Sequence, residues 1–279
     1  MLLSKIYEHP RDKYIVFKDR DENGKKIHKY IVINYNDETS NHNIDPTSVT
    51  TVAGKYEPPF NRDEIISNIL GSKKMGDPEY KYYGMTREDI IKLWGSNNGA
   101  ELGTILHDRI ELFYNCVLQP DQVPDTIEFQ YFLDFFQDFE TKFPGWRPYR
   151  TEWFVWTDVF KDNKMVVGAI DMVFINEQGE LAIFDWKRVG KIKDVQKTWN
   201  KNLRTYTNKR MLGLLSHFED SKYNHYCIQL NIYRYILQTY YNKNVTMLYL
   251  VVCHPENSKY ELLEVPMLDN EINSIFNEI

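Results

Sequence analysis

Cysteine is scarce in this chain and is not arranged for pairing. The 279 residues hold three cysteines, Cys116, Cys227 and Cys253, and no two of them stand in a Cys-x-x-Cys spacing. Small secreted domains that depend on disulfides carry many more, so a disulfide framework is excluded. Scattered thiols are typical of a reducing compartment, and we therefore expect an intracellular protein.

Long apolar runs and leader sequences are absent as well. No stretch approaches the roughly 18 apolar residues of a membrane span, and no secretory signal opens the chain, so we expect no membrane association. The sequence has no glycine-rich phosphate loop, which argues against an enzyme of small phosphorylated molecules. A hydrophobic content of 42% over 279 residues fits one large globular domain or two small ones.

The most informative segment runs from Gly168 to Lys187 and predicts a β-hairpin. Apolar and β-branched residues surround Asp171 on its first strand, and the second strand ends in Asp185-Trp186-Lys187. Near-continuous apolar strands are buried on both faces, where a carboxylate is costly unless it is paired or binds a metal. The alternative is a solvated hairpin with an exposed ion pair, since acid-x-Lys tripeptides are common by chance.

These residue types suit metal-assisted cleavage of a phosphodiester. Asp171 and Asp185 offer hard anionic oxygens, which favour Mg²⁺ or Mn²⁺. Such a metal polarises the scissile phosphate and lowers the pKa of a bound water. Lys187 shares a strand face with Asp185, where its ammonium can hold the attacking water or offset charge on the phosphate. Trp186 points the other way, but its backbone carbonyl can still reach the metal.

Two predicted helices carry further polar pairs at helical spacing. In the helix from Asn98 to Asn115, His107 and Glu111 are four residues apart and share a face, so the imidazole can complete a metal site. A core histidine with a surface glutamate is the alternative there. In a long helix further downstream, Gln229 and Tyr233 have the same spacing, and the alternative is an aromatic core stripe.

Four motifs thus follow one another along the chain: Gly103-Thr104 with His107, Gly168-x-x-Asp171, Asp185-Trp186-Lys187, and Gln229-x-x-x-Tyr233. In this order they resemble the RecB-like branch of the PD-(D/E)XK nuclease superfamily, over roughly Met85 to Pro255. Each motif is weak alone, but the four together on suitable elements are specific. Within the branch the chain is most similar to stand-alone exonucleases, such as viral and phage enzymes and the mitochondrial genome maintenance exonuclease.

The resemblance implies a mixed α/β (α+β) fold with a restriction-endonuclease-like core. A central mixed sheet of about four or five strands would be flanked by helices, with the active site at one edge of the sheet. Residues 85–279 would form the nuclease domain, and residues 1–84 an N-terminal extension whose β-hairpin packs on it. The resemblance also implies a cytoplasmic protein, or a viral or phage protein that acts in the host cell.

The resemblance also implies roles for individual residues. The implied metal ligands are His107, Asp171, Asp185 and, through its carbonyl, Trp186. The implied catalytic residues are Asp171, Asp185 and Lys187, and Gln229 and Tyr233 would contact substrate or position the active-site groups. The cofactor would be Mg²⁺ or Mn²⁺. Some members of the branch hold an iron–sulfur cluster through four cysteines, but this chain has three, so we expect no cluster.

Acidic residues outnumber basic ones overall, but positive charge is concentrated in one segment. The net charge of −6 argues against nucleic-acid binding by the whole surface. From Lys187 to Arg210, however, there are nine basic residues and one acid, with aromatic residues between them. Because this segment starts at the predicted catalytic lysine, we favour contact with a phosphate backbone and stacked bases over a solvated basic loop. The predicted substrate contacts there are Arg188, Lys191, Lys193, Trp199 and Tyr206.

Local patterns predict the other elements. A hairpin joins strands at 14–17 and 29–34, and residues 44–83 form a loop with one helix near 62–70. Thr86 and Asp89 form a capping box at a helix start. Further helices are expected over residues 127–143, 221–241 and near the C-terminus, and strands over 150–160, 245–253 and 260–265. Glu152 and Glu111 are additional candidate site residues, with surface glutamates as the alternative.

The leading hypothesis is a Mg²⁺- or Mn²⁺-dependent deoxyribonuclease, an exonuclease that acts on single-stranded DNA or strand ends. Its partners would be DNA and other proteins of replication, repair or recombination. One alternative is an RNA endonuclease of the cap-snatching kind, although the Gln-x-x-x-Tyr motif favours the RecB-like branch. Another is a catalytically inert nucleic-acid-binding subunit, but inert relatives usually lose an acid or the lysine, and those residues are all present here.

Overall fold

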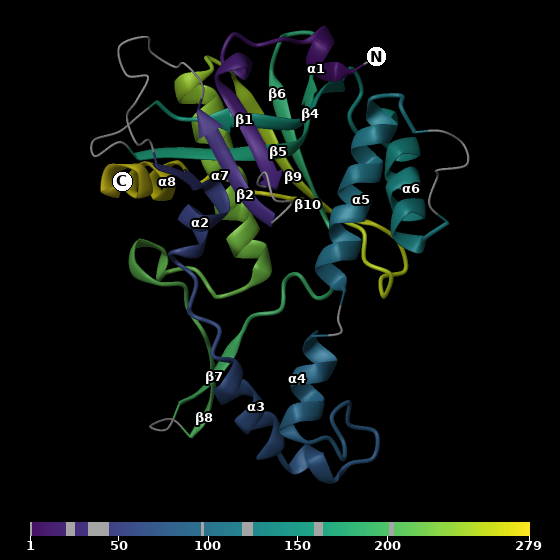
Figure 1. Ribbon diagram of the computed structural model, residues 1–279, viewed down its shortest axis with the longest axis vertical. Coiled ribbons are helices and arrows are strands. Elements are labelled where there is room, and N and C mark those ends of the chain that lie inside the picture. Colours follow the sequence, from purple (N-terminus) through teal and green to yellow (C-terminus); the bar gives the residue numbers. More distant parts are fainter. Residues whose placement is uncertain are drawn as a thin grey trace.

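The computed structural model describes residues 2–20, 26–32, 45–95, 98–118, 125–158, 164–200 and 204–279, with only the backbone for 15–20, 26–32, 45 and 198–200. A six-stranded mixed sheet lies at the centre, and helices cover both of its faces (Figure 1). This arrangement confirms the predicted α/β fold with a central mixed sheet. Within the described ranges, no helix combines the length and the apolar composition needed to cross a membrane.

The sheet has the strand order β10-β9-β6-β5-β3, and β4 also pairs with β5. The 12-residue strand β5 (Lys164–Ile175) is followed by β6 (Leu181–Lys187), which is antiparallel to it. On its other edge β6 runs parallel to β9 (Val245–Val252), and β9 carries the antiparallel β10 (Glu261–Glu264). The strand β4 (Arg147–Trp156) runs antiparallel along β5.

Two strands share the remaining edge of β5 and leave a gap between them. The short β3 (Asp45–Ser48) pairs in parallel with Lys164–Val167, whereas β6 pairs with Met172–Ile175. Residues 168–171 of β5 therefore have no partner on that edge among the described strands. We call this place the fork: it comprises residues 168–171 of β5 and residues 185–187 of β6, where the two strands separate.

Helices from distant parts of the chain cover the two faces. On one face lie α5 (Gly99–Tyr114) and α6 (Ile127–Lys142). On the other lie α2 (Val49–Gly54), α7 (Lys222–Tyr240) and α8 (Asp269–Glu278). Both faces of the sheet are thus buried, as its near-continuous apolar strands predicted.

The side chains of β6 alternate between the two cores. Phe184 and Trp186 belong to the core under α5 and α6, whereas Leu181 and Ile183 belong to the core under α7. Successive strand residues point to opposite faces, so Asp185 and Lys187 point toward α7. Burial of six consecutive residues at 181–186 explains why the strand tolerates one carboxylate only with a charged partner.

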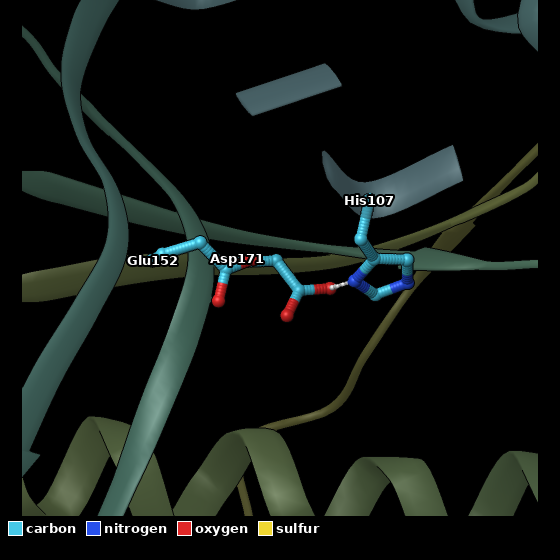
Figure 2. Close-up of side chains that lie close together, drawn as sticks. All are labelled: His107, Glu152 and Asp171. Carbon is cyan, nitrogen blue, oxygen red and sulfur yellow. Dashed lines mark ion pairs between the residues drawn. The ribbon is translucent and has the colours of Figure 1, made fainter. Parts of the chain in front are cut away.

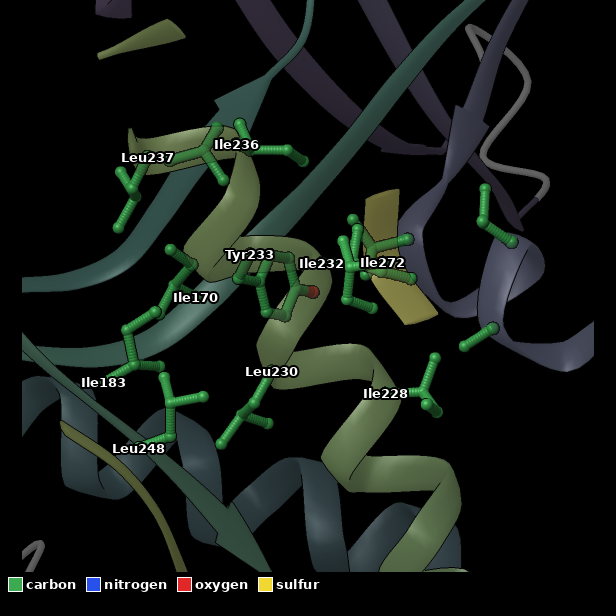
Figure 3. Packing of buried hydrophobic residues seen from close by; sticks show 14 of the residues in the cluster. Ile170, Ile183, Ile228, Leu230, Ile232, Tyr233, Ile236, Leu237, Leu248 and Ile272 are labelled. Atoms are coloured by element: carbon green, nitrogen blue, oxygen red, sulfur yellow. The ribbon is translucent and has the colours of Figure 1, made fainter. Parts of the chain in front are cut away.

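Helix α7 packs closely against β5 at Gly168. A Cβ atom at Gly168 would lie 2.7 Å from Cε1 of Tyr233 and 2.8 Å from its hydroxyl oxygen. Figure 3 shows Tyr233 on α7 beside Ile170 and Ile232, and its side chain is almost fully buried. Glycine at position 168 therefore permits the helix to approach the strand. The Gly-x-x-Asp and Gln-x-x-x-Tyr motifs meet at this contact.

A second part of the chain projects away from the sheet (Figure 1). It contains α3 (Arg62–Leu70), a 3₁₀ turn (Lys73–Gly76), α4 (Arg87–Gly95) and the hairpin of β7 (Lys197–Asn200) and β8 (Thr205–Asn208). We call residues 57–95 and this hairpin the arm. The two chain segments of the arm meet where they join the rest of the protein, because the N–H of Leu212 donates to the carbonyl of Tyr56 at 2.8 Å.

The N-terminal residues dock on the sheet through charged groups. After α1 (Leu3–Ile6) and a 3₁₀ turn (Asp12–Tyr14), the chain forms the predicted hairpin of β1 (Ile15–Arg20) and β2 (Lys26–Val32). Asp12 accepts from the buried Arg150 of β4 at 2.7 Å. This contact joins the first residues of the chain to the strand that carries Glu152.

Most predicted elements are present, and the differences have simple causes. Helix α3 has the predicted bounds, and Thr86 and Asp89 form the predicted capping box: the N–H of Thr86 donates to Asp89 and the N–H of Asp89 to Thr86. The sheet has six strands rather than the expected four or five. The strand β3 was not predicted, because its sequence Asp-Pro-Thr-Ser lacks strand propensity. The fork also lies within the sheet and not at an outer edge. The predicted division at residue 84 falls inside the arm, and β3 and α2 before it belong to the central layers.

Candidate metal centre

The fork places one carboxylate and one imidazole next to the backbone of β6. The backbone N–H of Trp186 donates to Oδ2 of Asp171 at 2.9 Å, so the carboxylate occupies the position of a strand partner. From α5, His107 reaches the same place: its Nδ1 lies 3.3 Å from Oδ2 of Asp171 (Figure 2). Its Nε2 lies 2.8 Å from the carbonyl oxygen of Trp186.

These two contacts define the state of the imidazole. A carbonyl oxygen can only accept, so Nε2 of His107 carries a proton toward Trp186. In the neutral ring Nδ1 then directs a lone pair at the Asp171 carboxylate, which is also an acceptor. Two acceptor atoms 3.3 Å apart repel unless a positive charge lies beside both. The geometry therefore favours a positive charge at this point.

Glu152 of β4 completes a group of three ligands. One ligand atom from each of His107, Glu152 and Asp171 lies within 4.8 Å of the other two. The backbone of Glu152 has a φ of +42°, in the left-handed region that is costly for a residue with a side chain. Its neighbours Thr151 and Trp153 pair with Met172 and Ile170, so Glu152 lies at the level of Asp171.

The spacing of these atoms fits a divalent cation. Octahedral Mg²⁺ at about 2.1 Å places its ligands roughly 3 Å apart when adjacent and roughly 4.2 Å apart when opposite. Small side-chain rotations would bring the three ligand atoms into that range. Two carboxylates and one imidazole do not by themselves select Mg²⁺ or Mn²⁺ over other divalent ions.

The protonation state of Glu152 is also consistent with a cation-binding site. Burial, with Asp171, Glu111 and Asp108 nearby, raises the pKa of the Glu152 carboxyl to about 9. The metal-free protein therefore keeps a proton there at neutral pH, which avoids repulsion between neighbouring carboxylates. A bound cation would remove the cause of that shift and release the proton.

Asp185 and Lys187 form an ion pair beside this group. Nζ of Lys187 lies 2.5 Å from Oδ2 of Asp185, and both side chains are largely buried. Burial raises the pKa of Asp185 to about 6, with Asp171 adding to the shift and Lys187 opposing it. Burial acts to lower the pKa of Lys187, but Asp185, Asp171 and Tyr226 outweigh it and keep the pKa above its usual value. Both groups are charged at neutral pH.

Tyr226 of α7 covers the lysine. Its ring centroid lies 4.5 Å from Nζ of Lys187, a distance at which the ring face attracts an ammonium. The sequence suggested only a core position for this tyrosine. The signal that could have found it is its place three residues before Gln229, on the face of the helix that meets β6.

A pocket of about 600 Å³ opens beside the metal centre. It is lined along one side of α5 from Ala100 through His107 to Glu111, and by Glu152 and Phe154 of β4. Burial and the nearby Asp108 raise the pKa of Glu111. A pocket with this many acidic groups repels a bare phosphate, so it can receive one only together with a cation.

The structure brings together part of the site predicted from the sequence. His107, Asp171 and the Trp186 carbonyl meet at the fork, Asp185 and Lys187 lie next to them, and both Glu152 and Glu111 line the pocket. Asp185 is tied to Lys187 and is not in the three-ligand group.

The predicted substrate contacts are more dispersed. Tyr233 lies in the core against Gly168, and Gln229 is half-buried on α7 with no side-chain hydrogen bond to any described residue. Arg188 forms an ion pair with Glu128 of α6 at 2.6 Å, and both side chains are largely buried. Tyr233 and Arg188 thus make contacts between elements around the site in this structure.

The exposed members of the basic segment lie at the fork end and in the arm. Lys191 and Lys193 are exposed. Tyr206 of β8 is 65% exposed, and its backbone is paired with that of Trp199 in β7. The hairpin thus places the two predicted stacking residues opposite each other in register, a pairing that the sequence did not predict. The side chain of Trp199 lies outside the described part of the structure.

No protein-family model matches the sequence, and no curated protein matches it. Among solved structures, one titled "Crystal structure of SSO0001" is similar to this chain at 12% identity and a TM-score of 0.31. The similarity covers 86% of this chain and 77% of the other. A superposition this loose indicates neither a shared fold nor a shared function.

Proposed function

We propose that this protein is a divalent-metal-dependent nuclease that hydrolyses DNA phosphodiester bonds, acting on single strands or strand ends. One observation carries the proposal: a group of metal-ligand type, His107, Glu152 and Asp171, lies at the fork directly beside a buried lysine–aspartate pair. Hydrolysis of a phosphodiester needs a cation at the phosphate and a positive group near the developing charge. The three ligands would bind the cation, and the lysine would be the positive group.

The residues divide the work as follows. His107, Glu152 and Asp171, with the Trp186 carbonyl within reach, would hold Mg²⁺ or Mn²⁺. Once bound, the cation would supply Lewis-acid chemistry and lower the pKa of a coordinated water. Glu152 would give up its proton to solvent when the cation binds, so that two carboxylates and one imidazole would hold it. The backbone N–H of Trp186 keeps Asp171 oriented, because it donates to the oxygen that also faces His107.

Lys187 acts on the substrate rather than on the metal. Asp185 keeps its ammonium charged and fixes it at the fork, and the Tyr226 ring restricts its movement from the α7 side. A fixed positive charge in a largely buried site stabilises charge on a phosphate more strongly than a mobile surface lysine does. The ammonium can also hold the attacking water by a hydrogen bond.

The preference for single strands follows from the surroundings of the site. Tyr206 is exposed on the β7–β8 hairpin, where stacking requires unpaired bases. Exposed lysines at 191 and 193 lie between the fork and that hairpin and suit a phosphate backbone. RNA endonuclease activity and inert binding are the competing functions, and one experiment separates all three.

The test is incubation of the protein with Mn²⁺ or Mg²⁺ and end-labelled oligonucleotides: linear and circular single-stranded DNA, blunt duplex DNA and single-stranded RNA. We expect metal-dependent cleavage of linear single-stranded DNA, loss of cleavage in Asp171→Asn, and normal cleavage in the exposed control Asp194→Asn. Cleavage of RNA alone would favour the endonuclease alternative. Binding without cleavage at any metal concentration would favour the inert subunit.

A further inference from the structure

The arm carries aromatic side chains on its surface instead of in a core. Between residues 57 and 95 only Ile66 and Ile90 are buried. Phe60 is 71% exposed and Tyr83 is 50% exposed. The Phe60 ring lies 6.2 Å from that of Trp94, whose indole N–H donates to the hydroxyl of Tyr82 at 3.3 Å. Trp94 and Tyr82 are half-buried, so Phe60 is the exposed ring of this group. Exposed aromatic side chains that gather on one surface are typical of a binding site.

Lysines accompany these rings. Nζ of Lys81 lies 5.5 Å from the centroid of the Tyr82 ring, and Nζ of Lys74 lies 5.9 Å from that of Tyr80. Both lysines are exposed. Ammonium groups beside aromatic rings suit a nucleic-acid strand, because they can contact its phosphates while the rings stack on its bases.

The acidic side chains of the arm are mostly engaged elsewhere. Asp63, Glu64, Glu88 and Asp89 lie in the first turns of α3 and α4, where they complement the positive ends of the helices. Asp63 also pairs with Arg87 at 2.6 Å. The side chain of Asp77 accepts from the N–H of Glu79 within a turn. The carboxylate of Glu79, which is exposed next to Tyr80, has no such contact among the described residues. The lysines are therefore the positively charged groups that lie beside the rings.

The pocket at the metal centre leads toward this surface. It follows α5 from Glu111 back to Ala100, a length of about 16 Å along the helix axis. Helix α4, which carries Trp94, ends at Gly95, and α5 begins at Gly99. A strand that leaves the metal centre along the pocket therefore arrives at the arm.

We propose that the aromatic and lysine surface of the arm, formed by Phe60, Lys74, Lys81, Tyr82, Tyr83 and Trp94, binds single-stranded nucleic acid outside the catalytic pocket. This inference rests on the proposed nuclease function and adds a second contact region for the same substrate. Bases stack on the rings while the lysines contact the phosphates. The arm thereby holds the part of the strand that is distant from the bond being cut.

The test measures strand binding without cleavage. Fluorescein-labelled oligothymidylate of about 20 nucleotides, long enough for several stacked bases, is titrated with the full chain in EDTA by fluorescence anisotropy. Phe60→Ala and Tyr83→Ala should each weaken binding by about 5- to 100-fold, the range that stacking of one base supports. Their high exposure means that thermal unfolding should not change. Ile6→Ala, at 49% exposure on α1, is the matched control and should bind as wild type.

The lysines have a separate readout. Lys74→Ala and Lys81→Ala should each reduce the slope of log affinity against log salt by about 0.7, as expected for one lost phosphate contact on a single strand. Lys5→Ala on α1, which is also exposed, should leave the slope unchanged. In cleavage assays with Mn²⁺, the arm variants should lose rate on long strands and keep the wild-type rate on a dinucleotide.

The arm proposal would be overturned by wild-type affinity in both aromatic variants, or by equal binding of blunt duplex and single strands. Self-association that Phe60→Ala abolishes without an effect on strand binding would also overturn it and identify a dimer surface. Arm-dependent binding in a protein that cleaves nothing would support the arm surface while refuting the nuclease.

Discussion

The fork and the arm differ in how far their aromatic side chains are exposed to solvent. At the fork Trp186 is 2% exposed and packs with Phe132 and Phe135 of α6, whereas Phe60 of the arm is 71% exposed. The fork holds the Asp185–Lys187 ion pair largely buried, with its positions set by packing of the surrounding side chains. In the arm, the rings of Phe60 and Tyr83 are exposed and accessible to a ligand. Under the proposed function, the buried region would carry out the chemistry and the exposed one would bind the substrate.

The largest expected effect comes from removing a ligand at the fork. Asp171→Asn keeps the size of the side chain and can still accept from the N–H of Trp186, but it removes the charge that faces His107. We expect Mn²⁺ binding, measured by calorimetry, to become undetectable, because a compact divalent site needs its carboxylates. Thermal unfolding of the metal-free variant should stay close to wild type. Mn²⁺ binding at wild-type affinity would contradict the assigned site.

Lys187→Met sharpens the division of roles within the fork. The substitution should lower the cleavage rate by about two to three orders of magnitude, the usual cost of losing one preorganised charge-stabilising group. Mn²⁺ binding should persist, because lysine is not a ligand. Stability should also fall, by up to about 3–5 kcal/mol, since the buried Asp185 loses its partner.

The double variant with Lys187→Met and Asp185→Asn is the control for the loss of stability, because the second substitution removes the unpaired charge of Asp185. The double variant should regain stability and remain inactive. A double variant that regains activity would show that Lys187 has only a structural role.

Gly168→Ala tests the packing that supports the fork. The new methyl group would collide with the Tyr233 ring, whose position is fixed by the core. We expect destabilisation of about 1–3 kcal/mol, typical of overpacking, seen as a lower thermal midpoint. Gly54→Ala is the control, because a Cβ atom there meets nothing within 4 Å. Equal midpoints in the two variants would mean that the helix moves aside at no cost.

The pH dependence of stability reports on Glu152. Its pKa is raised from 4.5 to about 9, so between these values the metal-free folded state holds a proton that the unfolded state has released. The free energy of unfolding should therefore fall as pH rises through this window. Stabilisation by Mn²⁺ should be greater at about pH 8 than at about pH 6, because bound metal displaces that proton. Glu152→Gln should flatten both trends in thermal unfolding, and trends as steep as wild type would place the responsible group elsewhere.

The smallest expected effect belongs to the exposed hairpin. Tyr206→Ala should weaken single-strand binding by about 5-fold and leave Mn²⁺ binding and thermal unfolding unchanged, since the residue is 65% exposed. Thr205→Ala, at the next position, is the control. A loss of stability in Tyr206→Ala would show that the arm has more internal packing than its exposure suggests.

The two regions also differ in how well the sequence predicts them. Strands β5 and β6 and helices α5 and α7 follow from apolar patterns that burial imposes, and His107, Asp171 and Lys187 were found by their spacing on those elements. The arm hairpin β7–β8 and the strand β3 were not predicted, because exposed or very short strands carry little hydrophobic signal. Glu152 could not be ranked above a surface glutamate, since its proximity to Asp171 arises from pairing of strands β4 and β5. Tyr226 was assigned to the core because its contact with Lys187 arises from packing of α7 against β6, which the sequence alone does not show.

The most direct test of the account is the Mn²⁺ dependence of cleavage of end-labelled linear single-stranded DNA by the wild-type chain and by Asp171→Asn at equal protein concentration. The account predicts that the wild-type rate rises with Mn²⁺ to a plateau and falls to the EDTA background when the metal is removed, while Asp171→Asn stays at background throughout. Metal-independent cleavage, or a wild-type rate in Asp171→Asn, would contradict the claim that the fork is a metal-dependent nuclease centre.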